Sequence, residues 1–239
     1  MHRHVQAFIQ TAVETFDLAA PIYEFGFATN AGPAGAAPPC DGTEIERLDQ
    51  LARLPFPDGA ARTVIAINTL EHVFDPRRAA DELIRILAPG GMLLIASESD
   101  PLMPLSPDHY WRPTPRAMQR VLAGLEATLV GWQGAERFAH SLFGIGCKRP
   151  VAGTFVSGVN RFLDRFQHRL DRLAAEVSWS QRLKRLLLGW TRGPTERRQH
   201  RDYYQSRFTL HLPLGPQFKH QLLGPGPPEQ KTGTRLDLG

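Results

Sequence analysis

The chain has 239 residues, with a hydrophobic fraction of 42% and a charged fraction of 22%, values that are typical of a soluble globular protein. Its apolar runs are too short to span a bilayer, and its first residues lack the apolar stretch of a secretory signal. The two cysteines, Cys40 and Cys147, fit neither a disulfide framework nor a metal-ligand spacing. We therefore expect a protein of the reducing cytoplasm without a metal site.

The net charge of +4 is unevenly distributed along the chain. Residues 1–150 hold 13 Lys/Arg and 17 Asp/Glu, a net −4, whereas the remaining residues hold 15 and 7, a net +8. This asymmetry predicts two parts with different surroundings. We expect an N-terminal helix over 1–19, a main domain over 20–150, a basic helical extension over 151–223 and a disordered tail over 224–239.

The first elements are short. Residues 5–19 place Val5, Phe8 and Ile9 at helical spacing, which predicts an amphipathic helix. Residues 21–27 are a strand candidate. The next segment, 28–43, is rich in Gly, Ala and Pro and is typical of a loop.

A βαβ unit follows. The continuous apolar run 63–68 predicts a strand buried on both faces. Asp75 is a candidate N-cap for a helix over 76–87 that begins with proline. The sequence Ala-Pro-Gly-Gly at 88–91 ends that helix in a left-handed turn, and 92–97 form a second buried strand. Such a unit predicts parallel strands joined by a right-handed crossover.

The later elements are less regular. Residues 114–125 predict a helix, and the runs 127–134 and 141–148 predict a hairpin that closes one edge of the sheet. Apolar residues at 156–177 step by three and four, the pattern of a heptad stripe. Strict alternation over 208–214 predicts a late strand.

Several motifs in this order resemble one protein family. Residues 54–97 resemble the core of the methyltransferase type 11 group of class I S-adenosylmethionine-dependent methyltransferases. The shared pieces are the LPFPD turn at 54–58, the Leu-Glu-His-Val element at 70–73 and the L-x-P-G-G turn at 87–91. Residues 107–115 resemble the HYWRFTP element of a subset of the family. The resemblance implies an α/β fold, a doubly wound Rossmann-like sheet with an antiparallel edge hairpin, followed here by a helical C-terminal extension.

The resemblance also implies where the site lies. Ligands of open α/β sheets bind outside the carboxyl ends of the strands. The residues that would contact S-adenosylmethionine are Glu24, Gly26, Asp41, Asp49, Asn68, Leu70 and Glu71. His72, His109 and Tyr110 would face the methyl acceptor. A base is needed only if the acceptor must lose a proton; otherwise alignment is the main requirement.

Each of these residues also has a structural interpretation. Glu24 could be a carboxylate at a strand end, and Gly26 a turn glycine. Glu71 and His72 could cap the next helix, and Tyr110 could belong to a packed lid.

The glycine-rich cofactor loop departs from the family pattern. The family's E-x-G-x-G-x-G is here Glu-Phe-Gly-Phe-Ala-Thr-Asn over 24–30, with one glycine of three. The nine residues between Asn30 and Cys40 cannot hold a full helix and a second strand. The nucleotide half of the site is therefore abbreviated, or it holds the nucleotide differently, or binding has been lost.

The resulting hypothesis is a methyltransferase that acts on a small-molecule, sugar or lipid acceptor. The alternative is an inactive relative that serves as a binding or scaffolding module. The basic extension has three interpretations, a helical cap, a membrane-surface helix over 180–192, and a site for an acidic partner. The acidic partner, including nucleic acid, is the weakest of these interpretations because the sequence has no nucleic-acid motif. The stripe at 156–177 could also mediate a homodimer.

Overall fold

The computed structural model describes residues 3–26, 53–98, 110–134, 139–151, 153–175, 206–212 and, for the backbone alone, 221–223. Its elements follow in the order α1 (Arg3–Thr15), β1 (Ile22–Gly26), β2 (Ala61–Ile67), the 3-10 helix η2 (Leu70–His72), α2 (Pro76–Ile86), β3 (Leu87–Glu98), α3 (Pro115–Val121), β4 (Ala127–Gln133), β5 (Ser141–Cys147), α4 (Gly153–Ala175), β6 (Ser206–His211) and β7 (Gln221–Leu223). The predicted loop 28–43, helix 180–190 and tail 224–239 lie outside the described residues.

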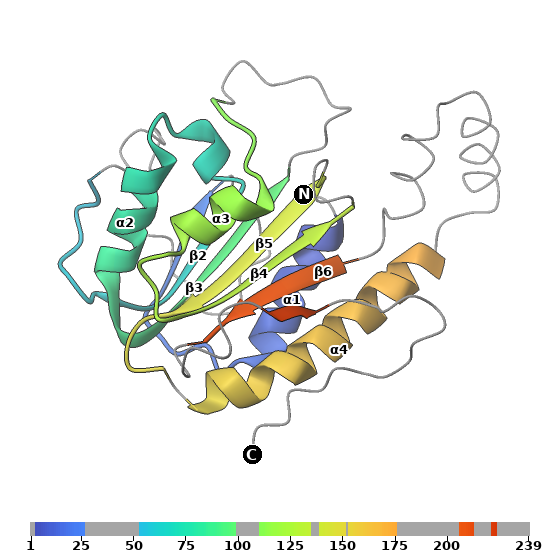
Figure 1. Ribbon diagram of the computed structural model, residues 1–239. Helices are drawn as coiled ribbons and strands as arrows, with labels where there is room; N and C mark the ends of the chain where they lie inside the picture. The colour runs from blue at the N-terminus through green and yellow to red at the C-terminus, as the bar shows by residue number, and fades with distance from the viewer. Residues whose placement is uncertain are drawn as a thin grey trace.

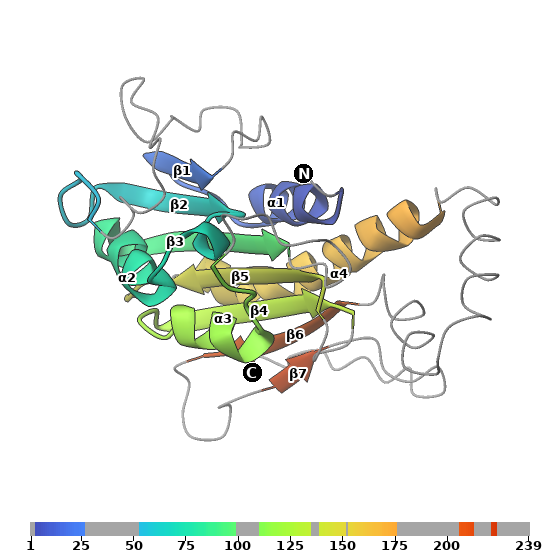
Figure 2. The ribbon, with the colours of Figure 1, turned by 90° about the horizontal axis from the view of Figure 1, so that it is seen from above.

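The strands form one seven-stranded sheet in the order β1-β2-β3-β5-β4-β6-β7 (Figure 2). Strands β1, β2 and β3 are parallel, and all later pairings are antiparallel. Among the described helices, α2 and α3 cover one face of the sheet, and α1 and α4 cover the other (Figure 1). The predicted doubly wound α/β fold is confirmed.

The βαβ unit forms as predicted. The side chain of Asp75 accepts a hydrogen bond of 3.0 Å from the backbone N–H of Arg78, and proline occupies the first turn of α2. Lys148 caps the other end, since its ammonium donates to the carbonyls of Ile84 at 2.9 Å and Leu87 at 2.6 Å. Burial lowers the pKa of this lysine.

The Pro-Gly-Gly turn differs from the prediction in one respect. Gly90 has the expected left-handed conformation, with φ +72°. However, strand β3 already begins at Leu87, so the turn is an irregularity within the strand. The register moves from Ala61 opposite Leu87 to Thr63 opposite Met92. The chain therefore bulges outward for a few residues before regular pairing resumes.

The LPFPD turn is fixed by α2. The guanidinium of Arg85 donates to the carbonyls of Leu54 at 3.2 Å and Phe56 at 2.9 Å, and it pairs with Glu82 at 2.9 Å. The Leu54 N–H in turn donates to the Glu82 carboxylate at 3.0 Å. These bonds fix the segment that leads into β2.

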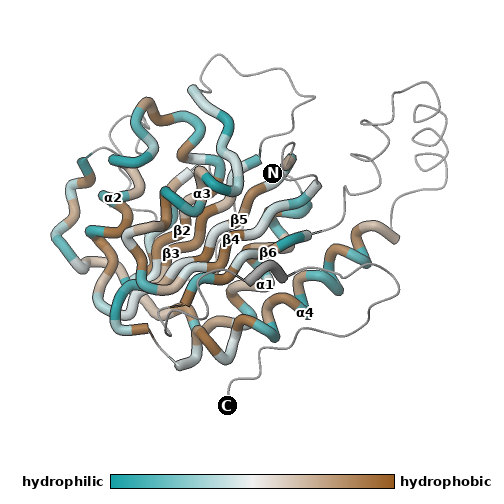
Figure 3. The backbone as a smooth tube through the Cα atoms, viewed as in Figure 1, coloured by the Kyte–Doolittle hydropathy of each residue, from teal (hydrophilic) through white to brown (hydrophobic). Residues whose placement is uncertain are grey.

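The strands are rich in apolar residues (Figure 3). Their buried side chains form a separate core on each face of the sheet. On the α1 and α4 face, aromatic rings dominate. The ring of Phe8 stacks on Phe143 with centroids 4.8 Å apart, and Phe162 stacks on Phe166 at 5.7 Å. Aromatic burial of this kind makes large contributions to core stability.

The hairpin of β4 and β5 is present but does not form the outer edge of the sheet. Strand β6 pairs with β4, and β7 pairs with β6, so two further strands lie beyond it. Residues 208–211 supply most of β6, which confirms the late strand. The prediction of an edge hairpin missed this because β6 is separated from β5 by a long intervening segment.

Helix α4 uses the predicted apolar stripe within the chain. Its buried face consists of Phe155, Gly158, Val159, Phe162, Phe166 and Leu170. The predicted stripe included Val159, Phe166 and Leu170, but the structure centres the face on Phe155 and Phe162 as well. Because these side chains cover the sheet and α1, they are not free for the homodimer proposed through 156–177.

Helix α3 is shorter than predicted. It begins after Thr114, whose hydroxyl accepts a hydrogen bond from the Ala117 N–H at 3.2 Å. It ends at Val121 rather than near residue 125, and a turn leads from there into β4.

Candidate active site

The carboxyl ends of β2 and β3 are joined by Asn68. This residue has φ +47°, a left-handed conformation that asparagine tolerates better than most side chains. Its side-chain amide donates to the Glu98 carboxylate at 3.3 Å, and its Oδ1 accepts from the Glu98 N–H at 3.1 Å. Its own N–H donates to the Ala96 carbonyl at 2.8 Å. Asn68 therefore holds Glu98 at the edge where a ligand is expected.

Gly26 ends β1 at the same edge with φ +136°. A Cβ atom at this position would overlap the carbonyl oxygen of Ile67 and would lie 3.0 Å from the hydroxyl of Thr69. That hydroxyl, buried at the end of β2, lies 3.0 Å from the Phe25 carbonyl. The glycine is therefore required by the close approach of β1 to β2, so the turn-glycine interpretation accounts for it without a cofactor.

Glu71 is the most unusual residue of the site. Its side chain is only 3% exposed, and its Oε2 has no hydrogen-bond partner. Burial raises the pKa of Glu71 to about 7, and the neighbouring negative charge of Glu98 adds to this rise. The nearby Ser97 hydroxyl partly opposes the shift, although Ser97 Oγ is itself buried without a partner of good hydrogen-bond geometry.

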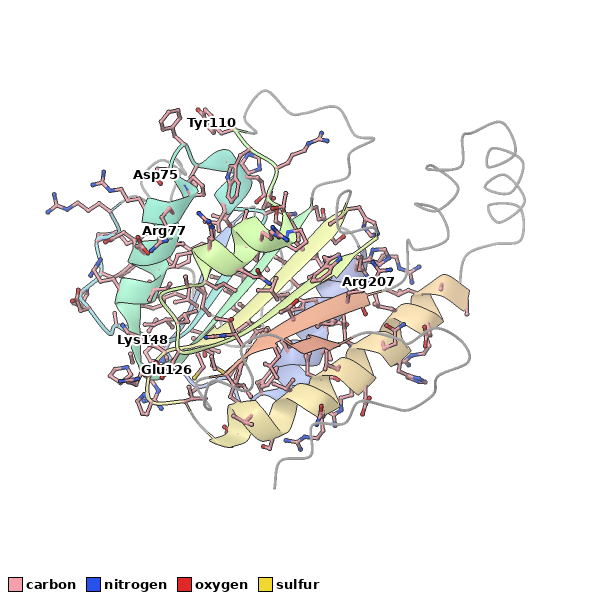
Figure 4. The ribbon with its side chains drawn as sticks, viewed as in Figure 1. Asp75, Arg77, Tyr110, Glu126, Lys148 and Arg207 are labelled. Atoms are coloured by element: carbon pink, nitrogen blue, oxygen red, sulfur yellow. The ribbon has the colours of Figure 1, made fainter. Side chains whose placement is uncertain are left out.

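Tyr110 and Trp111 form a strap that crosses η2. The Tyr110 N–H donates to the Glu71 carbonyl at 2.9 Å, and the Trp111 indole N–H donates to the Leu70 carbonyl. The rings of Phe74 and Tyr110 meet edge to face with centroids 5.9 Å apart. The exposed rings of Phe74 and Tyr110 form an aromatic rim beside Glu71. Tyr110 lies at the opposite end of the sheet from Glu126 and Lys148 (Figure 4).

The predicted site residues divide into three groups. Asn68, Glu71 and Tyr110 gather at the carboxyl edge together with the half-buried His72, and the half-buried Glu24 lies two residues before the end of β1, opposite Ile65. The side chain of Leu70 is 1% exposed and belongs to the core under α2. Asp41, Asp49 and His109 lie outside the described residues.

Sequence reasoning missed four residues at this edge. Ser97 and Trp132 occupy one register row, each opposite Leu142, and Gln133 shares a row with Glu98, each opposite Ser141. Ser97, Trp132 and Gln133 are buried and carry polar atoms without partners. Buried polar groups are normally hydrogen-bonded to protein, water or ligand. We therefore expect the unpartnered atoms at this edge to bind water or a ligand. Polar residues at the ends of apolar strands were the available signal.

The charges at this edge suit a cationic group. Glu24, Glu71 and Glu98 supply carboxylates, and Asn68 supplies an amide that already orients one of them. S-adenosylmethionine carries a sulfonium and an ammonium group, so its methionine end fits this donor set. The sequence residues assigned to its adenosine end, Asp41 and Asp49, lie outside the described part of the chain.

An open sheet with helices on both faces and acidic groups at the carboxyl ends of its parallel strands defines a doubly wound α/β protein, a class whose ligands bind at that edge. Residues 36–95 match the profile of the family described as "Methyltransferase domain". Over that segment the chain is similar to S-adenosylmethionine-dependent methyltransferases, and the resemblance seen in the sequence is confirmed.

Relatives of known name match the same part of the chain. A demethylmenaquinone methyltransferase of Clavibacter sepedonicus is 42% identical over 52 residues, which is 22% of this chain and 21% of that protein. An uncharacterized methyltransferase of Mycobacterium sp. (strain JLS) is 36% identical over 67 residues, 28% of this chain and 25% of that protein. The chain thus spans about a quarter of the length of these relatives or less.

Solved structures of similar fold include an S-adenosylmethionine-dependent methyltransferase of Thermotoga maritima, described as a possible histamine N-methyltransferase. It is 18% identical, with a TM-score of 0.44, and the match covers 61% of this chain and 91% of that one.

Among the described residues, no helix is long and apolar enough to cross a membrane.

Proposed function

We propose that this protein transfers the methyl group of S-adenosylmethionine to a small-molecule, sugar or lipid acceptor at the carboxyl edge of β2 and β3. The observation that carries the proposal is the arrangement around Asn68, Glu71 and Glu98, which comes from the family-matched segment and its immediate continuation. When bound, S-adenosylmethionine supplies a methyl group on a sulfonium sulfur that is already activated for displacement.

The chain's own residues have separate tasks in this proposal. Glu24 and Glu98 attract the cationic end of the cofactor, and Asn68 keeps the Glu98 carboxylate in place. The strap at Tyr110 and Trp111 covers η2 and limits access of water to Glu71. Correct alignment of the acceptor beside the methyl group is then the main requirement for transfer.

The acceptor would enter beside the aromatic rim. Phe74 is 84% exposed and Tyr110 is 63% exposed, and both rings lie next to η2. Exposed apolar side chains that touch each other beside a polar site commonly mark a ligand surface. The relatives named demethylmenaquinone methyltransferase support a small-molecule acceptor.

A second candidate is a methyltransferase fold that has lost cofactor binding and serves as a binding module. One observation favours it: Gly26, the single glycine kept from the cofactor motif, is explained by its contact with Ile67 alone. The two candidates make opposite predictions for cofactor binding.

Calorimetric titration of the full chain with S-adenosylmethionine separates them. We expect binding, and we expect Glu24→Gln to weaken it by about tenfold, the usual effect of losing one charge-assisted hydrogen bond. Glu126→Gln is the matched control, because Glu126 pairs with Arg149 at the opposite end of the sheet (Figure 4). If no binding is detectable at millimolar cofactor, the enzyme proposal is wrong and the binding-module alternative stands.

A further inference from the structure

Glu71 is buried, and one of its two carboxylate oxygens, Oε2, has no hydrogen-bond partner. It follows β2 directly, in η2, and its backbone carbonyl is already bonded to Tyr110. Its carboxylate turns into the protein, yet Oε2 has no partner. Leaving a buried polar atom unpaired is unfavourable. A methionine or leucine at this position would have no unpaired polar atom. The presence of a carboxylate therefore indicates that it binds a ligand.

The groups that face Glu71 come from each element packed around it. Strand β3 contributes Ser97 and Glu98, of which Glu98 is negatively charged and held by Asn68 from the end of β2. The neighbouring His72 is half-buried on η2, and the strap contributes the backbone of Tyr110. Two carboxyl groups thus share one edge of the sheet, and one of them, Glu71, keeps its Oε2 without a hydrogen-bond partner.

The cofactor and its product differ in charge at one atom. S-adenosylmethionine has a positively charged sulfonium, whereas S-adenosylhomocysteine has a neutral thioether at the same position. We propose that Glu71 is the counter-ion through which this site distinguishes the methyl-loaded cofactor from its demethylated product. This inference rests on the proposed function, and it assigns Glu71 a specificity role rather than general cofactor contact.

The protonation of Glu71 gives this role its mechanism. With its pKa near 7, an empty site holds Glu71 largely protonated at pH 6. A nearby opposite charge lowers the pKa of a carboxyl by about 1–3 units, so arrival of the sulfonium drives the proton from Glu71 Oε to solvent. After methyl transfer the thioether no longer holds the carboxylate, which takes up a proton again, and the product is released more easily.

Proton release measured during binding tests the proposal without any methyl acceptor. The full chain is titrated with S-adenosylmethionine or S-adenosylhomocysteine by calorimetry at pH 6, in two buffers of different ionisation enthalpy. For a pKa that falls by about 2 on binding, S-adenosylmethionine should release about 0.8 of a proton at pH 6 and about 0.1 at pH 8. S-adenosylhomocysteine should release close to none at either pH.

Two variants make the result specific to Glu71. Glu71→Gln keeps the size of the side chain and removes the titration, so the difference in proton release between the two ligands should vanish. Glu126→Gln, at the far end of the sheet, should leave it unchanged. Ser97→Ala removes a hydroxyl that lowers the pKa of Glu71, so more proton should be released at pH 7 than in the original protein.

The outcomes separate this inference from the function on which it depends. If both ligands bind with equal proton release, or if Glu71→Gln keeps the difference, Glu71 is not the counter-ion, although the methyltransferase proposal stands. If neither ligand binds, the proposed function itself fails, and this inference with it. A Glu71-dependent difference supports both.

Discussion

Replacing Glu71 with glutamine should change how the stability of the protein depends on pH. The pKa of Glu71 is about 7 in the folded protein, against its ordinary value of 4.5 in the unfolded chain. A carboxyl whose pKa is raised by folding stabilises the folded state while it is protonated, and that contribution is lost as pH rises through the folded pKa. The window is therefore roughly pH 5 to 8, and stability falls with increasing pH.

The magnitude follows from the two pKa values. At pH 5 the raised pKa contributes about 2.5 kcal/mol to the free energy of unfolding, and at pH 8 it contributes close to zero. Glu71→Gln has no such contribution at either pH. Relative to this variant, the original protein should thus lose about 2.5 kcal/mol between pH 5 and pH 8.

Urea unfolding of both proteins at pH 5, 6, 7 and 8 measures this difference, with the midpoint and slope fitted at each pH. Subtracting the two curves removes the titration of all other groups. Parallel curves, with a constant difference across the range, would show that the Glu71 carboxyl is not desolvated as described. The reasoning on its burial would then be refuted.

Three further substitutions test the local structure, each by urea unfolding. Gly26→Ala should destabilise the protein by about 3 kcal/mol or more, because a Cβ atom at this positive φ overlaps the Ile67 carbonyl. The control Gly153→Ala should change stability little, since nothing lies within 4 Å of the new atom. Equal effects of the two substitutions would contradict the close approach of β1 to β2. Asp75→Ala removes the N-cap of α2 and should cost about 1 kcal/mol, while an unchanged midpoint would mean that the cap is not made in solution. Lys148→Met leaves the final carbonyls of α2 without their donor and should lower the free energy of unfolding by about 1–3 kcal/mol. An unchanged free energy would show that water replaces the ammonium as the donor.

Gly26 also changes how binding experiments must be designed. Its substitution would be a natural test of the cofactor loop, because glycines there let the backbone approach a ligand. The structure shows that the same substitution disturbs the junction of β1 and β2. Lost binding in such a variant would therefore not distinguish a damaged site from a damaged fold, which is why Glu24 and Glu71 are the better targets.

The βαβ unit was predictable because its signals are local. The apolar run of β2, the Asp-Pro start of α2 and the Pro-Gly-Gly turn each lie within a few residues of the feature they define. The hairpin of β4 and β5 was also found from its two apolar runs. The position of β6 was not, because pairing across a long sequence separation leaves no local pattern.

Helix α4 illustrates the same limit. Its apolar periodicity identified a helix, but periodicity does not say which surface covers the stripe. Phe155 and Phe162 were absent from the predicted stripe because a strict three-four step passes over them, yet both are buried against α1 and the sheet. A helix on a sheet buries a wider face than a two-stranded coiled-coil seam.

The candidate site was predictable in position and only partly in detail. The Leu-Glu-His-Val element fell at the carboxyl edge, as the parallel strands require. Which of its side chains turn inward could not be read from four letters, since that depends on the 3-10 turn and on the strap from Tyr110. Leu70 and Glu71 thus both proved to be buried, with different consequences for a ligand.

The proposed function requires S-adenosylmethionine to bind at the carboxyl edge of β2 and β3. Backbone amide exchange of the full chain, with and without S-adenosylhomocysteine as a stable ligand, shows where on the chain the ligand binds. We predict slower exchange over residues 67–72 and 96–98 on binding, and no change around Glu126 and Lys148 at the opposite end of the sheet (Figure 4). Protection confined to that opposite end, or no protection at saturating ligand, would contradict the claim.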